Sequence, residues 1–182
     1  MMPGPVVLYG SSTFTLWTER MIKESFSGLD IINRGFGGST SEEALDNYRT
    51  LVKPLEPSVI VYYEGTNDIA RGQRPEESFG NTLSIFEMSK DDNPYIVWIF
   101  LLLHKCPSFA EHHNDFDKLN QMYTDFCSKN KRCFYVDAND ALVDFDIIAD
   151  AYMDDGIHFN EKAYGKLGIL MNKKLEETKS WI

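Results

Sequence analysis

The sequence has no long hydrophobic run and no recognisable leader segment. Residues 95–103 form an apolar stretch that is about half the length needed to cross a bilayer. The first residues also lack the basic region and the apolar core of a signal peptide. These absences exclude an obvious membrane anchor, and they lead us to expect a cytoplasmic protein.

Cysteine is scarce, with only Cys106, Cys127 and Cys133 in 182 residues. None of them belongs to a CxxC pair of the kind found in metal sites, and an odd number does not suit a disulfide framework. We therefore expect free, buried thiols, and we expect neither a metal site nor a cofactor.

Basic residues are outnumbered, because 18 Lys and Arg face 28 Asp and Glu and leave a formal net charge of −10. Repulsion from phosphate groups argues against general binding to nucleic acid or to an anionic membrane. The length and a hydrophobic content of 43% fit one domain over residues 1–182. No repeat, linker or low-complexity segment divides it, and its oligomeric state is left open.

Five apolar segments have the character of strands, and segments with helical spacing lie between them. Near-continuous apolar runs are typical of strands covered on both faces of a parallel sheet. Strict alternation of strands and helices predicts a three-layer α/β/α sandwich, flavodoxin-like, with about five mainly parallel strands. The predicted strands are Val6–Tyr9, Ile31–Asn33, Val59–Tyr63, Tyr95–Leu102 and Cys133–Val136.

The predicted helices carry recognisable start signals. Pairs Ser39…Glu42 and Thr40…Glu43 offer a capping box in either of two registers, before an apolar face that runs from Ala44 to Leu55. Further helices are expected after Pro75, around residues 116–126, and after Asn160, which can cap the last one.

Polar loops that contain glycine follow the first three strands. In a parallel sheet these loops open on the edge where ligands bind, beyond the carboxyl ends of the strands. Asp155 and His158 lie beyond the fifth strand and share one short loop. The three loops are Gly10-Ser11-Ser12-Thr13, Asn33–Thr40 and Glu64–Asp68.

These residue types together can make a nucleophile. A hydroxyl needs a base to become nucleophilic, and the base needs an acceptor that fixes its tautomer. His158 and Asp155 supply the base and the acceptor. From the residues alone, Ser11, Ser12 or Thr13 could provide the attacking hydroxyl, and each fragment by itself is also an ordinary turn or helix cap.

The ordered set of fragments resembles the four conserved blocks of the SGNH hydrolases, the GDSL esterase–lipase group. Those blocks are a Gly-Asp-Ser after the first strand, an Asn segment ending in a key Gly, a Gly-x-Asn-Asp, and an Asp-x-x-His near the end. This chain has Gly10-Ser11-Ser12, Asn33…Gly38, Gly65-Thr66-Asn67-Asp68 and Asp155-Gly156-Ile157-His158, in that order and across most of its length.

The resemblance implies a role for each matching residue. Ser12 would be the nucleophile, His158 its base and Asp155 the group that orients the imidazole. The oxyanion hole would consist of the backbone N–H groups of Ser12 and Gly38 and the side-chain amide of Asn67. Ser11 stands where the family usually has Asp, whose side chain supports neighbouring loops.

The function that follows is a serine esterase acting on small acyl esters, with acetyl esters of carbohydrates as one possibility. A thioesterase or an acyltransferase would use the same triad, and the sequence does not separate them. The alternative from another class is a non-catalytic α/β module that holds a small ligand or phosphate on the Gly35–Thr40 loop. That alternative leaves Asp155 and His158 unexplained.

Several other residues are candidates for lesser roles near the site. Asp68 would order its loop through backbone N–H groups or cap a helix. His104 and Lys105 would contact substrate or serve ordinary loop roles. Seven aspartates without a Lys or Arg between residues 137 and 155 would disfavour anionic acyl groups. Phe14, Trp17 and Phe36 would either line an apolar acyl pocket or pack in the core.

Overall fold

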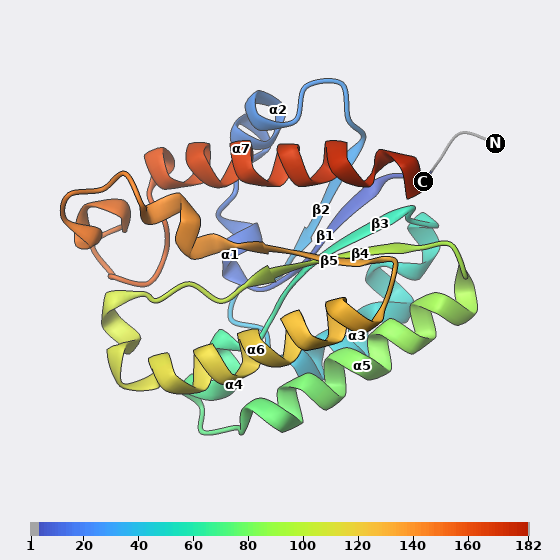
Figure 1. Ribbon diagram of the computed structural model, residues 1–182, viewed down its shortest axis with the longest axis horizontal. Helices are drawn as coiled ribbons and strands as arrows, with labels where there is room; N and C mark the ends of the chain where they lie inside the picture. The colour runs from blue at the N-terminus through green and yellow to red at the C-terminus, as the bar shows by residue number, and fades with distance from the viewer. Residues whose placement is uncertain (1–3, 182) are drawn as a thin grey trace.

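Five parallel strands form one sheet in the order β2-β1-β3-β4-β5 (Figure 1). The computed structural model describes residues 4–181 of the chain. The predicted α/β sandwich with parallel strands is confirmed. The strands are β1 (Val6–Gly10), β2 (Ile31–Gly35), β3 (Val59–Tyr63), β4 (Val97–Leu102) and β5 (Cys133–Asp137).

The predicted strand bounds need one real correction, at the start of β4. The apolar run begins at Tyr95, but the strand begins at Val97. Tyr95 is 72% exposed, and its backbone N–H donates to the side chain of Asn93 instead of to the sheet. The apolar run in the sequence therefore began two residues before the hydrogen-bonded strand, because it included an aromatic side chain that lies at the surface.

Helices cover both faces of the sheet (Figure 1). The last helix, α7, packs with α2 on one face, whereas α3, α5 and α6 pack side by side on the other. The α-helices are α1 (Ser12–Thr15), α2 (Glu19–Ser25), α3 (Ser41–Leu51), α4 (Thr66–Ala70), α5 (Pro75–Asp92), α6 (His113–Lys129) and α7 (Glu161–Thr178). Short 3-10 helices occupy Lys53–Leu55, Pro107–His112, Ala138–Leu142, Ile148–Ala151 and Lys179–Trp181.

The start of α3 shows which of the two capping registers is used. The Thr40 side chain accepts from the Glu43 N–H, and the Glu43 carboxylate accepts from the Thr40 N–H at 3.0 Å. The apolar face predicted to reach Leu55 was too long. The α-helix ends at Leu51, and a 3-10 turn containing Pro54 follows, because proline lacks the N–H that the helix requires.

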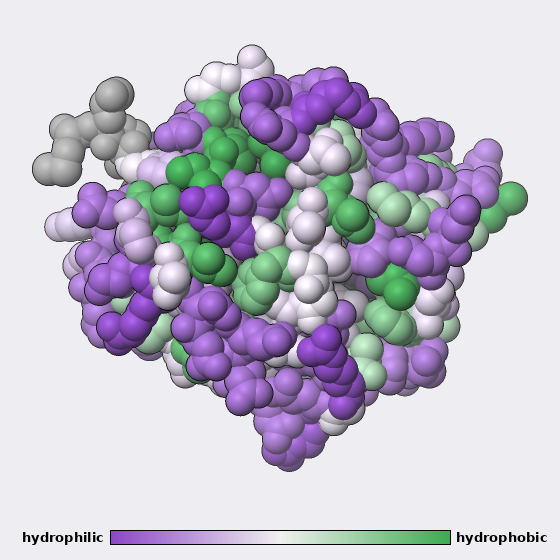
Figure 2. Space-filling model, turned by 180° about the vertical axis from the view of Figure 1, so that it is seen from behind, coloured by the Kyte–Doolittle hydropathy of each residue, from purple (hydrophilic) through white to green (hydrophobic). Residues whose placement is uncertain are grey.

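The core lies on both faces of the central strands. Every residue of β1, β3 and β4 is buried, whereas the edge strands β2 and β5 are covered only in part. On the face shown in Figure 2, hydrophilic side chains cover most of the surface and hydrophobic ones gather in a few patches. Between residues 4 and 181 no helix has the length and apolar character of a transmembrane span.

Candidate active site

The polar loops identified in the sequence meet at the carboxyl edge of the sheet. Strand β1 lies between β2 and β3, so the chain crosses to opposite sides after β1 and after β3. Such a switch point leaves a crevice between the loops that follow the two strands. The loop after β1 carries Ser12, and the loop after β3 carries Asn67.

The turn after β1 is tightly constrained. Gly10 has φ +152°, and a Cβ there would stand 2.0 Å from the carbonyl oxygen of Tyr63. Only glycine allows β1 and β3 to approach this closely at the turn. The side chain of Asn33, in the middle of β2, donates to the Phe14 carbonyl at 2.7 Å and thereby holds α1 in place. Ser12 therefore begins α1 at a fixed position.

Ser12, His158 and Asp155 form a continuous chain of contacts. Ser12 Oγ lies 2.7 Å from His158 Nε2, although the two residues are 146 positions apart. His158 Nδ1 lies 2.6 Å from Asp155 Oδ2. The other two candidate nucleophiles, Ser11 and Thr13, are buried at 2% and 5% exposure. Ser12 is thus the hydroxyl that lies against the histidine.

The Asp155 carboxylate is held by its own loop. Its Oδ1 accepts the backbone N–H groups of Ile157 and His158, at 2.8 and 3.0 Å. Slight burial pushes the pKa of Asp155 up, but hydrogen bonds from the His158 backbone and ring and from Ile157 bring that pKa below its ordinary value. Asp155 is therefore poised as the ionised partner of the imidazole.

The loop that carries Asp155 and His158 has a buried anchor. His104 is 2% exposed, stacks on Phe159 with ring centroids 4.2 Å apart, and lies 3.2 Å from the Tyr152 hydroxyl through Nδ1. Burial lowers the pKa of His104 to about 3, so its ring is neutral. His104 supports the loop from below and does not reach substrate, which decides between the two roles expected for it.

The three N–H groups expected to form the oxyanion hole differ in their protein partners. Within residues 4–181, neither the Ser12 N–H nor the Gly38 N–H donates to another protein group. The Asn67 amide donates one of its two hydrogens to the Ser39 carbonyl at 2.8 Å, which leaves the second available. Gly38 has φ +78°, a conformation that favours glycine.

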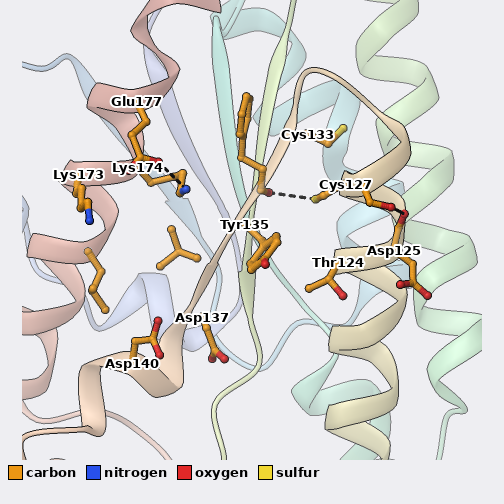
Figure 3. A pocket seen from close by; sticks show the side chains of 14 residues that line it. Thr124, Asp125, Cys127, Cys133, Tyr135, Asp137, Asp140, Lys173, Lys174 and Glu177 are labelled. Atoms are coloured by element: carbon orange, nitrogen blue, oxygen red, sulfur yellow. Dashed lines mark hydrogen bonds and ion pairs between the residues drawn. The ribbon is translucent and has the colours of Figure 1, made fainter.

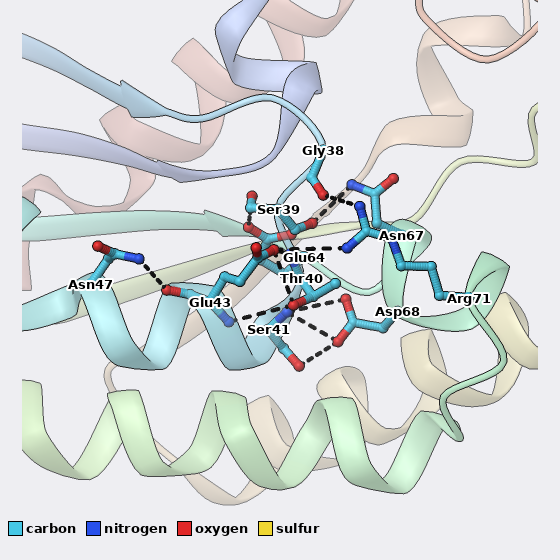
Figure 4. A network of polar contacts seen from close by, with 10 residues as sticks. All are labelled: Gly38, Ser39, Thr40, Ser41, Glu43, Asn47, Glu64, Asn67, Asp68 and Arg71. Atoms are coloured by element: carbon cyan, nitrogen blue, oxygen red, sulfur yellow. Dashed lines mark hydrogen bonds and ion pairs between the residues drawn. The ribbon is translucent and has the colours of Figure 1, made fainter.

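A polar network lies beside Gly38 and Asn67 (Figure 4). Ser39 Oγ donates to Glu64 Oε1 at 2.5 Å. The Asp68 carboxylate accepts the N–H and the hydroxyl of Ser41, at the first residue of α3. Asp68 therefore supports the start of α3, which is the helix-capping role expected for it. The backbone N–H that it accepts belongs to Ser41 and not to its own Glu64–Asp68 loop.

Several expected contributions to the site do not occur. Phe14 and Trp17 are 0% exposed and pack in the core, so neither forms the wall of an acyl pocket. Trp17 also lies beyond α1, which ends at Thr15. The Ser11 side chain makes no capping hydrogen bond to α1. Lys105 Nζ pairs with Asp117 at 2.8 Å, away from the triad.

A groove of about 580 Å³ lies along β5, between α6 and α7 (Figure 3). Its lining mixes acidic and basic side chains, and the Lys174–Glu177 ion pair at 2.6 Å joins two side chains of α7 along one wall. None of the triad or oxyanion residues lines this groove. No cluster of three His, Cys, Asp or Glu side chains in residues 4–181 is arranged to hold a metal ion.

Sequence reasoning missed two residues beside the Asn33–Thr40 loop, which we call the oxyanion loop because it carries Gly38. Glu64 follows β3 directly, and the signal that marks it is a carboxylate at the end of a fully apolar strand. Arg71 donates to the Gly38 carbonyl at 2.8 Å. No sequence pattern pointed to Arg71, because the contact joins residues 33 positions apart.

Comparison with known proteins shows that this chain is similar to acylhydrolases. A sequence profile of the GDSL-like Lipase/Acylhydrolase family matches residues 4–166. A candidate acylhydrolase from Bacteroides fragilis is 28% identical, with a TM-score of 0.80 over 97% of this chain and 91% of that one. A GDSL-like lipase from Bacteroides thetaiotaomicron is 25% identical, with a TM-score of 0.80 over 96% and 89% of the two chains.

A third structure shares the fold at lower identity. It is a carbohydrate esterase family 3 protein from Talaromyces cellulolyticus, 17% identical, with a TM-score of 0.80 over 98% of this chain and 99% of that one. No curated protein matches the chain.

Proposed function

The chain belongs to the GDSL-like Lipase/Acylhydrolase family of ester-bond hydrolases, and we propose that it is a serine esterase acting on small acyl esters. The observation that carries this proposal is the contact chain from Ser12 Oγ through the His158 ring to Asp155, at 2.7 and 2.6 Å. A hydroxyl, an imidazole and a carboxylate in this arrangement are the parts of a nucleophilic triad.

In the first half of the proposed reaction, Ser12 Oγ attacks the ester carbonyl carbon while His158 Nε2 accepts the hydroxyl proton. The bond to the alcohol then breaks, and the alcohol leaves with the proton that His158 returns. In the second half, water attacks the acyl-serine and gives a proton to His158. The acid departs, and Ser12 regains its proton. Asp155 orients the ring and stabilises its charged form throughout.

The negative charge that develops on the carbonyl oxygen needs donors fixed before the reaction. We assign this role to the N–H groups of Ser12 and Gly38 and to the free hydrogen of the Asn67 amide. Neither backbone N–H group has a partner among residues 4–181, which supports the assignment. The Asn67–Ser39 contact at 2.8 Å supports it as well, because it fixes the direction of the amide.

Two features favour a small acyl group. The 182 residues leave little sequence for a lid over a long-chain lipid. A protein of the same fold is a carbohydrate esterase, which makes acetyl esters of carbohydrates a reasonable substrate class. A series of acyl esters from acetyl to dodecanoyl, with the matching thioesters, would rank acyl length and separate esterase from thioesterase activity.

Ser12→Ala tests the proposed nucleophile. We expect it to abolish hydrolysis of p-nitrophenyl acetate, lowering kcat by about 10⁴-fold or more, and to abolish covalent labelling by a fluorophosphonate. The matched controls are Ser11→Ala and Thr13→Val, which remove the neighbouring hydroxyls and should keep the label. Labelling that persists in Ser12→Ala would move the nucleophile to one of these neighbours.

A further inference from the structure

Glu64 is a buried carboxylate that the triad and the oxyanion donors do not use directly. It is 1% exposed at the end of β3, one residue before the glycine that opens the Asn67 loop. Its Oε1 accepts from Ser39 Oγ at 2.5 Å, whereas its Oε2 has no hydrogen-bond partner within residues 4–181. A buried polar atom without a partner is costly, so this side chain requires an explanation beyond packing.

The contact with Ser39 connects Glu64 to the oxyanion donors (Figure 4). Ser39 is 2% exposed, and its carbonyl accepts the Asn67 amide at 2.8 Å. Its hydroxyl is held by Glu64. One residue therefore receives the amide through its backbone and is fixed through its side chain. A shift of Ser39 would carry the acceptor of the amide with it.

The other contacts of this loop do not hold Ser39 in place. Arg71 donates to the Gly38 carbonyl at 2.8 Å, but its side chain is 58% exposed and also pairs with Glu43 at 3.8 Å. An exposed guanidinium is screened by water and holds its partner weakly. Asp68 fixes Ser41, two residues further along the chain. Glu64 is thus the buried group that binds Ser39 itself.

We propose that Glu64 is a positioning residue for ester hydrolysis: through Ser39 it holds the Asn67 amide in the direction that receives the oxyanion. The inference rests on the proposed function of Asn67. This positioning role requires that Glu64 accept a hydrogen bond, and it does not depend on a negative charge. Burial raises the pKa of Glu64 well above its ordinary value, the Ser39 hydrogen bond opposes that rise, and the Asp68 and Glu43 carboxylates add to it.

The chain offers a matched pair of substitutions at this position. Glu64→Gln keeps the acceptor for Ser39 and removes the charge. Glu64→Met has a similar length and removes the acceptor. We expect Glu64→Gln to keep kcat for p-nitrophenyl acetate within about threefold of the wild type. We expect Glu64→Met to lower kcat by about 10- to 100-fold with KM within about twofold, because a misplaced donor acts on the transition state.

A double-mutant cycle with Asn67→Ala separates positioning from simple stability. Asn67→Ala alone should lower kcat by about 10²- to 10³-fold. If Glu64 acts through the Asn67 amide, then Glu64→Met should change kcat by less than about threefold in the Asn67→Ala background. Should Glu64→Met fail to fold, Ser39→Ala removes the same hydrogen bond from the other side and should show the same loss and the same lack of additivity.

The possible failures are distinct. An unchanged kcat in Asn67→Ala removes Asn67 from the oxyanion hole, and the present inference falls with it. A slow Asn67→Ala together with a fully active Glu64→Met overturns the inference alone. Equal losses in Glu64→Gln and Glu64→Met, or losses that add fully to that of Asn67→Ala, would also overturn it, because they indicate a general structural role.

Discussion

The two halves of the candidate site differ in how far their polar groups are exposed. The side chains of Asp155 and His158 remain 43% and 20% exposed. Behind the oxyanion loop, Glu64 and Asp68 are 1% and 0% exposed. Both halves are built from carboxylates, so the difference lies in their surroundings and not in their chemistry.

This difference matches what each half has to do. A group that exchanges protons with substrate and water needs access to both. Donors that stabilise a developing charge need to be fixed before it develops, and a buried network fixes them without later reorganisation. The same carboxylate chemistry is thus solvated where protons move and buried where geometry must not change.

We expect the two halves to respond to pH in opposite directions. The exposed loop rests on His104, whose burial lowers its pKa to about 3. The oxyanion loop rests on Glu64, whose burial raises its pKa. Acid therefore weakens the support of the catalytic loop, whereas base weakens the support of the oxyanion loop.

Asp155→Asn tests whether solvent exposure weakens the acid of the triad. The asparagine oxygen can still accept the N–H groups of Ile157 and His158, but its NH₂ would face Nδ1 and favour the wrong tautomer. For a buried triad carboxylate this change costs about 10⁴-fold in kcat. Because water partly solvates Asp155, we expect a smaller loss of about 10³-fold, measured with p-nitrophenyl acetate.

Asp154→Asn is the matched control, because it removes the neighbouring exposed carboxylate and should leave kcat within about twofold. A loss below tenfold in Asp155→Asn would remove Asp155 from the triad. A loss of 10⁴-fold or more would keep the triad but show that exposure does not weaken its acid, which breaks the comparison between the two halves.

His104→Phe tests the buried support of the catalytic loop. A histidine whose pKa is lowered in the folded state contributes stability above its unfolded pKa, and this contribution is lost as pH falls from about 6.5 toward about 3. Between pH 7 and pH 5 the loss amounts to about 2 kcal/mol. Phenylalanine can keep the stacking on Phe159 and does not titrate.

We therefore expect the free energy of unfolding of the wild type to fall between pH 7 and pH 5 by about 2 kcal/mol more than that of His104→Phe. Urea titrations at the two pH values measure this difference. His112→Phe, at the start of α6, serves as the control and should follow the wild type. Parallel pH profiles for the wild type and His104→Phe would show that His104 titrates normally.

Much of the fold followed from the sequence because its signals are local. Continuous apolar runs marked the five strands, and Thr40 and Asn160 marked the starts of two helices. The resemblance to SGNH hydrolases is confirmed by the family match over residues 4–166. The sequence also predicted the loops that meet at one edge, because parallel strands place their carboxyl ends together.

The supports of the site did not follow from the sequence, because they depend on contacts between distant segments. The Ser39–Glu64 hydrogen bond spans 25 positions. His104 was considered as a substrate contact, and only packing against Phe159 and Tyr152 reveals it as a buried anchor. Short helices such as α2 and α4 were also missed, because seven and five residues are too few for an apolar period to stand out.

Glu64→Gln tests the opposite pH response of the oxyanion half. A carboxyl whose pKa is raised in the folded state contributes stability below its unfolded pKa, and this contribution is lost as pH rises through the folded pKa. Burial is the main cause of the raised pKa, and the Asp68 and Glu43 carboxylates add to it, whereas the Ser39 hydrogen bond and the Arg71 charge favour the ionised form.

Glutamine does not titrate, so the stability of the wild type relative to Glu64→Gln should fall as pH rises from 5 to 9. Urea titrations at both values give this change, and Glu42→Gln, an exposed carboxylate at the start of α3, should show none. A relative stability that rises with pH would mean that Glu64 is ionised in the folded protein. Both halves of the site would then lose support in acid, and the contrast between them would lie in exposure alone.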